Sequence, residues 1–494
     1  MTTSAGIEVF NPGEFNSERH FYPRTLNAQI HPQVASFFRM SQERLISRYC
    51  HLHPFVQQDV LREILSTPPR YFRWSGTDVF NVSTEDGVRQ KLVVETNSCP
   101  SGQKSFPLLE EENEEGGYRR LIEQTFLPLM SKTLRKQGGE GEVVVLYDKN
   151  EMESSGYAQV LATLLDRPVL YVPCPVSDPH RHTTVRDRQL FVNYNGEELP
   201  VACGFRYVTQ RPWTRLPFDL KTPLLNPIVA CLAGGRNKTL AAKAYEAFNA
   251  KHRERGLEIR TPASFTNVRK AEVPLIVAQL GGKAVVKIPY LNAGQGIFTI
   301  VNDDELEAFM SQDYAYDAFI VQQLVGNFRW SSTTTQGKVF NIGTIPDKKS
   351  EIYVFDMRMM VSWQGDSCWR PVAMYARRAP LPMASELADG SESWSILGTN
   401  LSRKVGDEAW TTEPQRLLMF DRRDFAKLGL GMDDLIEAFV QSVMATLAID
   451  DMARRLVKRG GGFRADLFRS LALDEKLAGE IMTSGENGTS GVHA

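Results

Sequence analysis

The stretch VVETNSCPSG, residues 93–102, ends an apolar segment with a Glu-Thr-Asn triplet and then turns at Pro-Ser-Gly. Side chains two residues apart on a strand point to the same face of a sheet. Glu95 and Asn97 are therefore expected to present a carboxylate and an amide side by side. What lies opposite them decides whether that face can hold a ligand.

The preceding residues complete a predicted β-hairpin, TDVFNVSTEDGVRQKLVVETNS, residues 77–98. Asp86-Gly87 favours a two-residue turn, since both turn positions require positive φ. That turn places Asp78 opposite Glu95, and like charges about 5 Å apart repel unless a hard cation lies between them. Asp78, Glu95 and Asn97 are thus predicted to bind Mg²⁺. The alternative is an exposed hairpin with scattered acids, and a slip of one residue would break the pairing.

The composition is that of an ordinary globular protein. The chain has 494 residues, 42% of them hydrophobic and 23% charged, with a formal net charge of −2. This length allows two to four domains, and the charge gives no reason to expect nucleic acid or an anionic membrane as the main partner. No apolar run approaches the roughly 18 residues of a membrane span.

The cysteines and the N-terminus favour a cytoplasmic protein. The six cysteines lie far apart and form no CxxC pair, so we expect reduced and mostly buried thiols rather than disulfides or a zinc site. The first residues, MTTSAGIEVFNPGEFN, lack a basic segment followed by an apolar core, so no signal peptide is predicted.

A second group of candidate residues lies in the middle of the chain. Lys287 occurs within the apolar strand AVVKIP and needs an anionic partner or a path to solvent. The loop that follows, residues 292–296, contains Gly294 and Gly296, which would let backbone N–H groups approach phosphate oxygens. The P-loop and the dinucleotide fingerprint are both absent. Alone, this pattern is equally typical of a hairpin with an edge lysine.

Three arginines follow on predicted strands: Arg358 in FDMRMM, then Arg377 and Arg378 in MYARRAP. Arginine suits bidentate contacts with phosphate or carboxylate. On a regular strand, neighbouring residues face opposite ways, so only one of Arg377 and Arg378 can face a given site. The sequence leaves open which one it is.

These features together resemble the ATP-grasp enzymes. The resemblance rests on Lys287 with its glycine loop, the polar pair in VQQL (321–324) and Asp356-x-Arg358. An Asp and a Glu-x-Asn usually end the order of that family, but here Asp78 and the 95–97 triplet come first. The order is similar to that of the circularly permuted ATP-grasp group, which includes eukaryotic glutathione synthetase and glutathionylspermidine synthase. In some of those families Pro-Ser-Gly follows the triplet.

The resemblance covers roughly residues 70–410 and implies an α/β fold with α+β lobes. It implies a permuted ATP-grasp core, with an additional α/β domain on the substrate side that begins with the strand–helix–strand pattern after the KQGGEGE linker. The expected divisions are an N-terminal helical segment with the metal-binding strands (1–140), the substrate-side domain (141–235), the nucleotide lobe with the glycine loop (236–330), the remaining core with the C-terminal helices (331–475) and a disordered tail (476–494).

The resemblance also implies a role for each candidate residue. Many relatives carry an acidic residue at the hinge position, where this chain has a glutamine. The implied roles are Mg²⁺ binding for Asp78, Glu95 and Asn97; contacts with ATP phosphates for Lys287 and for Lys238 or Lys243; a flexible loop for Gly294 and Gly296; the adenine hinge for Gln322 and Leu324; and catalytic contacts for Arg358, for Arg377 or Arg378, and for Asn400 near the acceptor site.

The implied activity is an ATP-dependent carboxylate–amine ligase that uses ATP and Mg²⁺. Such an enzyme activates a small carboxylate, such as an amino acid or a short peptide, as an acyl phosphate that an amine then attacks. Two alternatives stay open: a nucleotide-binding protein without ligase activity, and a small-molecule kinase. The identity of the substrates and the oligomeric state do not follow from the sequence.

Overall fold

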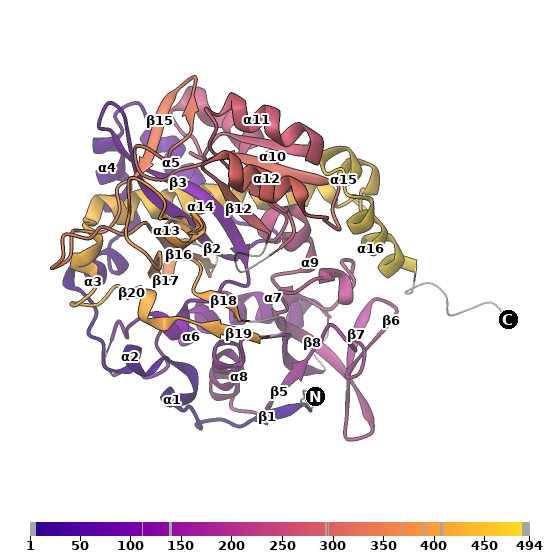
Figure 1. The fold of residues 1–494 in the computed structure, drawn as a ribbon. Helices are drawn as coiled ribbons and strands as arrows, with labels where there is room; N and C mark the ends of the chain where they lie inside the picture. Colours follow the sequence, from indigo (N-terminus) through magenta and orange to yellow (C-terminus); the bar gives the residue numbers. More distant parts are fainter. Residues whose placement is uncertain are drawn as a thin grey trace.

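The computed structural model describes residues 6–110, 112–137, 141–291, 294, 296–365, 367–388, 391–405 and 409–486. Within these residues the chain forms three main β-sheets with helices packed around them (Figure 1). The expected mixed α/β class is therefore confirmed.

The central sheet joins the predicted hairpin to strands from the last third of the sequence. All its pairings are antiparallel, and β2 is hydrogen-bonded to β3 on one side and to β16 on the other. The 93–102 stretch is thereby built into the middle of the molecule. The strands are β2 (Trp74–Thr84), β3 (Arg89–Ser98), β14 (Thr333–Thr334), β15 (Gly337–Asn341), β16 (Phe355–Gln364), β17 (Cys368–Arg378) and β20 (Leu417–Met419).

The turn of this hairpin differs from the prediction. The N–H of Thr84 donates to the carbonyl of Val88 at 3.0 Å, so three residues form the loop instead of two. The loop ends at Gly87, which has a φ of 79°. A type I turn followed by a left-handed glycine is the usual form of three-residue hairpin loops.

A β-bulge corrects the register that this longer loop shifts. Near the loop Val79 pairs with Val93, but one step further Asp78 pairs with Glu95, so Val94 is an extra residue on β3. The N–H of Val93 donates to a backbone carbonyl outside the sheet, that of Arg260, at 2.8 Å. The predicted turn was wrong, but the predicted pair is correct because the bulge compensates for the extra loop residue.

A second sheet carries the lysine and the glycine loop. It has four antiparallel strands in the order β10-β13-β11-β12, and residues 288–296 connect β11 to β12. Its apolar core is separate from the main core of the protein. The elements are β10 (Ser264–Arg269), α11 (Val273–Gln279), β11 (Ala284–Lys287), β12 (Ile297–Ile300), α12 (Asp303–Ser311) and β13 (Ala318–Gln323).

The third sheet contains the predicted strand–helix–strand unit. Strand β4 is parallel to both β5 and β8, and α8 connects β4 to β5. The sheet also includes β1 from the N-terminus, antiparallel to β5, which the sequence did not indicate. The elements are β1 (Glu8–Phe10), β4 (Glu142–Tyr147), α8 (Glu151–Leu165), β5 (Val169–Pro173), β6 (Thr183–Arg186), β7 (Gln189–Tyr194), β8 (Glu197–Tyr207) and β9 (Leu224–Leu225).

Helix α14 (Met432–Leu456) runs through the centre of the protein, where it contacts β2, β3, β16 and α10 (Lys238–His252) (Figure 1). Its side chains are buried on nearly every face, which is typical of a central core helix. No helix of the described residues is long and apolar enough to cross a membrane.

Shorter helices and one small hairpin complete the fold. They are α1 (Ser17–His20), α2 (Pro23–Leu26), α3 (Pro32–Phe38), α4 (Gln42–Leu52), α5 (Gln58–Leu65), α6 (Gly116–Leu121), α7 (Leu127–Gln137), α9 (Ile228–Ala230), α13 (Trp394–Leu397), β18 (Ser402–Val405), β19 (Ala409–Thr412), α15 (Ala465–Leu471) and α16 (Glu475–Glu486).

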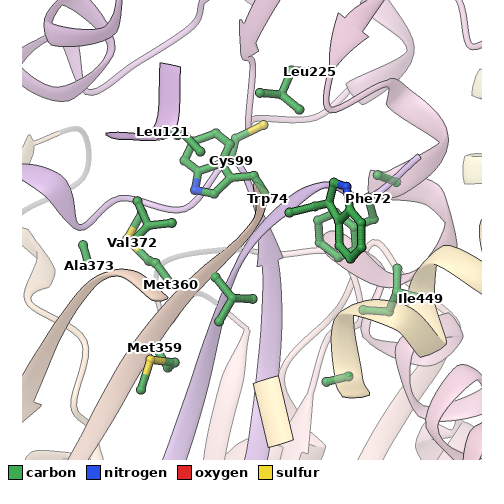
Figure 2. Close-up of a cluster of buried hydrophobic side chains, with 14 of the residues drawn as sticks. Phe72, Trp74, Cys99, Leu121, Leu225, Met359, Met360, Val372, Ala373 and Ile449 are labelled. Atoms are coloured by element: carbon green, nitrogen blue, oxygen red, sulfur yellow. The ribbon is translucent and has the colours of Figure 1, made fainter. Parts of the chain in front are cut away.

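The central and third sheets share one apolar core. Figure 2 shows Trp74 of β2 among side chains from several elements, with Phe72, Cys99 and Leu225 close by. The Trp74 ring lies 5.4 Å from that of Phe205 on β8, so the two sheets are packed directly against one another. All six cysteines are free and buried, in agreement with the sequence prediction.

The prediction that residues 476–494 form a disordered tail is wrong for the first part of this range. Residues up to Glu486 belong to α16, whose Leu477, Ala478 and Ile481 are buried. These residues share one helical face. Packing of that face stabilises the helix, although the sequence that follows is of low complexity. Residues 487–494 lie outside the described part of the chain.

A buried carboxylate near the end of α14 holds the segment that leads into β2. Asp450 accepts hydrogen bonds from the backbone N–H groups of Arg70 (3.0 Å), Tyr71 (2.6 Å) and Phe72 (2.8 Å). Its side chain is 1% exposed. Charged acceptors for several backbone donors make strong hydrogen bonds, so this contact sets where the central hairpin begins.

We expect Asp450→Ala to lower the free energy of unfolding by about 3–5 kcal/mol, since three buried N–H groups lose their acceptor. Asp451→Ala is the matched control, because this neighbouring carboxylate makes a surface ion pair with Arg455. That control should change the free energy by less than about 1 kcal/mol. Chemical denaturation measures both values, and equal effects of the two substitutions would contradict the assigned role of Asp450.

Candidate functional site

A cavity of about 740 Å³ lies where the three sheets meet. A smaller cavity of about 90 Å³ adjoins it and shares Asp78, Glu95 and Arg377 with it. Together they gather most of the residues predicted from the sequence. The large cavity is lined by Asp78, Glu95, Asn97, Lys238, Gly294, Arg358, Arg377 and Asn400, and the small one adds Lys287, Gln322 and Leu324.

The structure settles two alternatives that the sequence left open. Lys238 lines the cavity, whereas Lys243 pairs with Glu246 on the surface at 3.1 Å. Arg377 faces the cavity, whereas the guanidinium of Arg378 stacks over the ring of Tyr353 at 4.1 Å. Lys243 and Arg378 are therefore not brought to the site. Their opposite orientations follow from helical and strand periodicity.

Asp78 is held by two arginines of the neighbouring strands. Arg358, directly opposite it on β16, donates from Nε at 2.6 Å and from Nη2 at 2.8 Å. The Nη2 of Arg377 on β17 lies 3.0 Å from the same carboxylate. Burial would raise the pKa of Asp78, but the charges of both arginines outweigh burial and lower it to about 2. The carboxylate is therefore ionised at neutral pH.

Asp356 extends this charge network but was given no role from the sequence. It faces Arg377 on the adjacent strand and accepts a hydrogen bond from its Nε at 2.9 Å. Burial raises the pKa of Asp356, and the charge of Arg377 opposes that rise. Two carboxylates and two guanidinium groups thus form one buried cluster. Its sequence signal was the Asp356-x-Arg358 spacing.

Glu95 and Asn97 project from β3 into the same cavity. Glu95 is less constrained than Asp78, because its carboxylate is 3.4 Å from the Nζ of Lys238 and its side chain is 22% exposed. The Oδ1 of Asn97 accepts from Arg236 at 3.2 Å. The Nδ2 of Asn97 is buried, and no group in the described part of the chain accepts from it. Arg236, which follows a helical segment ending at Gly235, was missed by the sequence analysis.

This set of donors fits a Mg²⁺ ion, which prefers oxygen ligands and retains water or phosphate oxygens in its remaining positions. Asp78, Glu95 and Asn97 offer two carboxylates and one amide from one face of the hairpin. Oδ1 of Asp78 accepts one hydrogen bond, from Nε of Arg358, and keeps a lone pair for a cation, whereas Oδ2 is contacted by Nη2 of both arginines. The described residues contain no group of three or more His, Cys, Asp or Glu side chains suited to hold a metal. Non-protein ligands would therefore have to complete the coordination.

Lys287 is a buried ammonium with a neutral partner. Its Nζ donates to Oε1 of Gln322 at 2.6 Å, and the Nε2 of Gln322 donates to Ser264 at 2.7 Å, which fixes the orientation of the amide. Burial lowers the pKa of Lys287 to about 8, the charge of Glu95 raises it and that of Lys238 lowers it. The neutral glutamine at position 322 leaves the charge of Lys287 available to an anionic ligand.

The glycine loop reaches the cavity at Gly294. This residue has a φ of 78°, and a Cβ there would collide with the side-chain amide of Asn400. Only glycine permits so close an approach in this conformation. Asn400 also accepts from Arg377 at 3.5 Å, so it links the loop to the charge network. Gly296 ends the loop, where its carbonyl accepts from the N–H of Ile288 at 2.7 Å.

The segment expected to bind adenine is already hydrogen-bonded within the protein. The N–H of Leu324 donates to Oγ of Ser332 at 2.8 Å, and the N–H of Ser332 donates to the carbonyl of Leu324 at 3.0 Å. A base that used the backbone of Leu324 would have to replace or share these contacts. The side chain of Leu324 lines the small cavity, so the adenine contact stays a prediction.

The Pro-Ser-Gly turn of the 93–102 stretch is fixed by Glu153 of α8. This buried carboxylate accepts from Oγ of Ser101 at 2.8 Å and from the N–H groups of Gly102 and Gln103 at 2.7 and 3.0 Å. A Cβ on Gly102 would collide with Met360 of the central sheet. The turn therefore ties the candidate metal strand to the third sheet. Sequence reasoning missed Glu153 because no local pattern connects residues 50 positions apart.

No protein-family model matches the sequence, and no curated protein matches it. The fold resembles several solved structures. A glutathione synthetase-like effector from Globodera pallida has 12% identity and a TM-score of 0.35, with 72% of this chain and 86% of that chain covered. A RimK domain ATP-grasp protein from Sphaerobacter thermophilus has 12% identity and a TM-score of 0.30, with coverage of 60% and 99%.

D-alanyl-alanine synthetase A from Vibrio cholerae has 12% identity and a TM-score of 0.32, and the match covers 44% of this chain and 67% of that chain. The Sphaerobacter protein is described as an ATP-grasp protein, and ATP-grasp is the family that the sequence resembles. Likenesses of this size do not establish an activity. The function is therefore inferred from the residues of the cavity.

We expect Asp78→Asn and Glu95→Gln to differ in their effects on stability. The first leaves two buried arginines with one carboxylate between them, so the free energy of unfolding at pH 7 should fall by about 3–5 kcal/mol. The second removes a partly exposed carboxylate whose ion pair with Lys238 is long, at 3.4 Å, so the change should stay within about 1 kcal/mol. Urea denaturation measures both values, and a larger loss for Glu95→Gln would contradict the assigned contacts.

The effect of Asp78→Asn should also depend on pH. The pKa of Asp78 is lowered from 3.8 to about 2 in the folded protein, so its stabilising contribution is present above pH 4 and is lost as the pH falls toward 2. The stability difference between the wild type and this variant should accordingly shrink below pH 4. A difference that stays constant between pH 7 and pH 3 would contradict the lowered pKa.

Proposed function

We propose that the chain is an ATP-dependent carboxylate–amine ligase of the ATP-grasp kind. The observation that carries this proposal is the convergence of three kinds of group in one cavity. The hairpin supplies oxygen donors suited to a divalent cation, the second sheet supplies Lys287, and the central sheet supplies Arg358 and Arg377. A reaction that brings a triphosphate, a metal ion and a carboxylate together needs all three kinds.

The small cavity suits the nucleotide base and the nearby phosphates. Val285, Leu324, Val325 and Leu397 give it an apolar wall that can pack against a base. Lys287 lies at the boundary with the charged groups, where its ammonium can contact phosphate oxygens. A base placed against the apolar wall would therefore direct its phosphates toward the large cavity and Lys238.

The metal ligands would be Asp78, Glu95 and Asn97. When bound, Mg²⁺ would supply neutralisation of the phosphate charge and a fixed orientation of the phosphate oxygens. Lys238, which lies 3.4 Å from Glu95, and Lys287 would share that neutralisation. The pairing of Asp78 with two arginines keeps this carboxylate ionised and fixes its orientation.

The acid substrate is activated because a carboxylate is a poor electrophile with a poor leaving group. A carboxylate oxygen attacks the γ-phosphorus, the bond to the β–γ bridging oxygen breaks, and ADP leaves. An amine then attacks the acyl carbon, inorganic phosphate leaves with the C–O bond electrons, and the nitrogen loses a proton. Negative charge crowds between acid and γ-phosphate in the first step. Arg358 and Arg377, which line the large cavity, would stabilise that charge, and Asn400 would orient the acyl group.

The test is ADP release by the purified protein with MgATP, across a matrix of amino acids, other small carboxylic acids and amines. Turnover should require both an acid and an amine, and Glu95→Gln and Lys287→Met should each lower it by about 100-fold or more. Lys243→Met is the control and should be as active as the wild type, because this lysine pairs on the surface. Mass spectrometry of an active mixture identifies the amide.

ADP formation that needs an acid but no amine would indicate a kinase and not a ligase. Nucleotide binding without turnover under any condition of the matrix would favour a binding protein. Full activity of Glu95→Gln would contradict the proposed metal site and with it the mechanism.

A further inference from the structure

One wall of the large cavity, formed largely by the turn around Lys104 and the loop between β4 and α8, carries cations that the proposed reaction does not use. Lys104 and Lys149 line this wall together with Asn150, Tyr22 and Tyr207. Neither lysine lines the small cavity assigned to the nucleotide base. They form a separate charged region of the same space, defined here as the distal wall.

Lys149 lacks a counterion, although an acid precedes it in the chain. The carboxylate of Asp148 is bound by Arg215 at 2.8 Å and by the N–H groups of Thr209 and Gln210 at 2.7 and 2.6 Å. Within the described residues, Lys149 makes neither an ion pair nor a hydrogen bond. An ammonium removed from water without a partner is costly, so an anionic ligand would relieve that cost.

Lys104 lines the same wall and contacts Asn150, the residue that follows Lys149 in the chain. Its Nζ donates to the side-chain oxygen of Asn150 and lies 5.0 Å from the ring centre of Tyr22. Asn150 has a left-handed backbone, with φ at 59°, and its Nδ2 donates to the hydroxyl of Tyr207 at 2.9 Å. These contacts direct the amide oxygen toward Lys104. The lysine is therefore positioned, but its hydrogen-bond partner is neutral.

The nearest acids are held by other groups but still act on the distal wall: burial lowers the pKa of Lys104, and the charge of Glu153 opposes that shift. Glu153 accepts three hydrogen bonds from the turn at 101–103, and Asp148 is bound as described above. Burial lowers the pKa of Lys149 to about 8, the nearby charge of Arg236 lowers it further, and Asp148 partly opposes the shift. A bound anion would favour the charged form of the lysine and thereby be held more tightly.

We propose that the distal wall binds a second anionic group of the acid substrate, distinct from the carboxylate that is phosphorylated. Lys104 and Lys149 bind this group, which is a carboxylate or a phosphate. The substrate class is then a small acid with at least two anionic groups. This inference rests on the proposed ligase function for the role of the first carboxylate, but the binding that it predicts does not require ATP.

The experiment measures the binding of three acids of similar length to the full chain by calorimetry at pH 7 without nucleotide. The probes are pentanoate with one anionic group, glutarate with two carboxylates and 4-phosphonobutyrate with a carboxylate and a phosphonate. At least one dianionic probe should bind about 10-fold or more tightly than pentanoate, since each charge-assisted hydrogen bond adds affinity. Preference for glutarate indicates a second carboxylate, and preference for 4-phosphonobutyrate indicates a phosphate.

Variants assign the effect to the distal wall. Lys149→Met should abolish the preference for the dianionic probe, and Lys104→Met should weaken it, whereas Lys243→Met should leave it unchanged. The melting temperature of Lys149→Met should equal or exceed that of the wild type, because the substitution removes a half-buried charge that has no ion pair within the described residues; loss of binding is then not a loss of folding.

Equal affinity for the three probes, no binding of any of them, or a preference that survives in Lys149→Met would overturn the inference. These outcomes are separate from those of the ligase test. A dianion preference without ADP release would leave the distal wall supported and the ligase function contradicted. ADP release from substrates with one anionic group would support the ligase function and contradict the proposed role of the distal wall.

Discussion

The candidate site depends on the contact between Asp78 and the two arginines of the neighbouring strands. This cluster lies in the middle of the central sheet, where β2 is bonded to β3 on one side and to β16 on the other. Because the charges are buried, each needs the others, and the strands that carry them cannot slide without separating them. The same register that pairs Asp78 with Arg358 also places Glu95 beside it.

Around this cluster the protein arranges charges that a ligand would complete. Lys287 has an amide as its partner, Lys149 has no ion pair or hydrogen bond within the described residues, and the ion pair of Glu95 with Lys238 is long, at 3.4 Å. Such groups raise the energy of the ligand-free cavity, and binding of a metal ion and an anionic substrate would lower it. We therefore regard the cavity as one binding surface, in which the distal wall is separate from the proposed nucleotide site.

The sequence was sufficient to predict the arrangement of side chains where local rules determine the geometry. Strand alternation placed Glu95 and Asn97 on one face, and opposition of Asp78 to Glu95 was predicted correctly although the turn was not. The bulge at Val94 could not be foreseen, because a backbone contact with a distant segment, at Arg260, accompanies it. Strand alternation predicts that Arg377 and Arg378 on β17 point to opposite faces of the sheet. It does not predict which of the two faces the cavity.

The sequence analysis missed residues whose contacts are far away in the sequence, and the reason is physical. Arg236, Glu153 and Lys149 belong to loops or helix starts that carry no periodic signal. Tertiary packing alone brings Arg236 and Lys149 to the cavity and Glu153 to the turn at residues 101–103. The structured start of the C-terminal tail was missed in the same way. Its helix is stabilised by burial of one apolar face and not by a strong local propensity.

The most direct test of the central claim is the affinity of the protein for a non-hydrolysable ATP analogue, measured by calorimetry with and without Mg²⁺, for the wild type and Glu95→Gln. If Asp78, Glu95 and Asn97 hold the metal that orients the phosphates, Mg²⁺ should strengthen binding by about 10-fold or more in the wild type and have little effect in the variant. Equal strengthening by Mg²⁺ in both proteins, or none in the wild type, would contradict the assignment of this sheet face as the metal site.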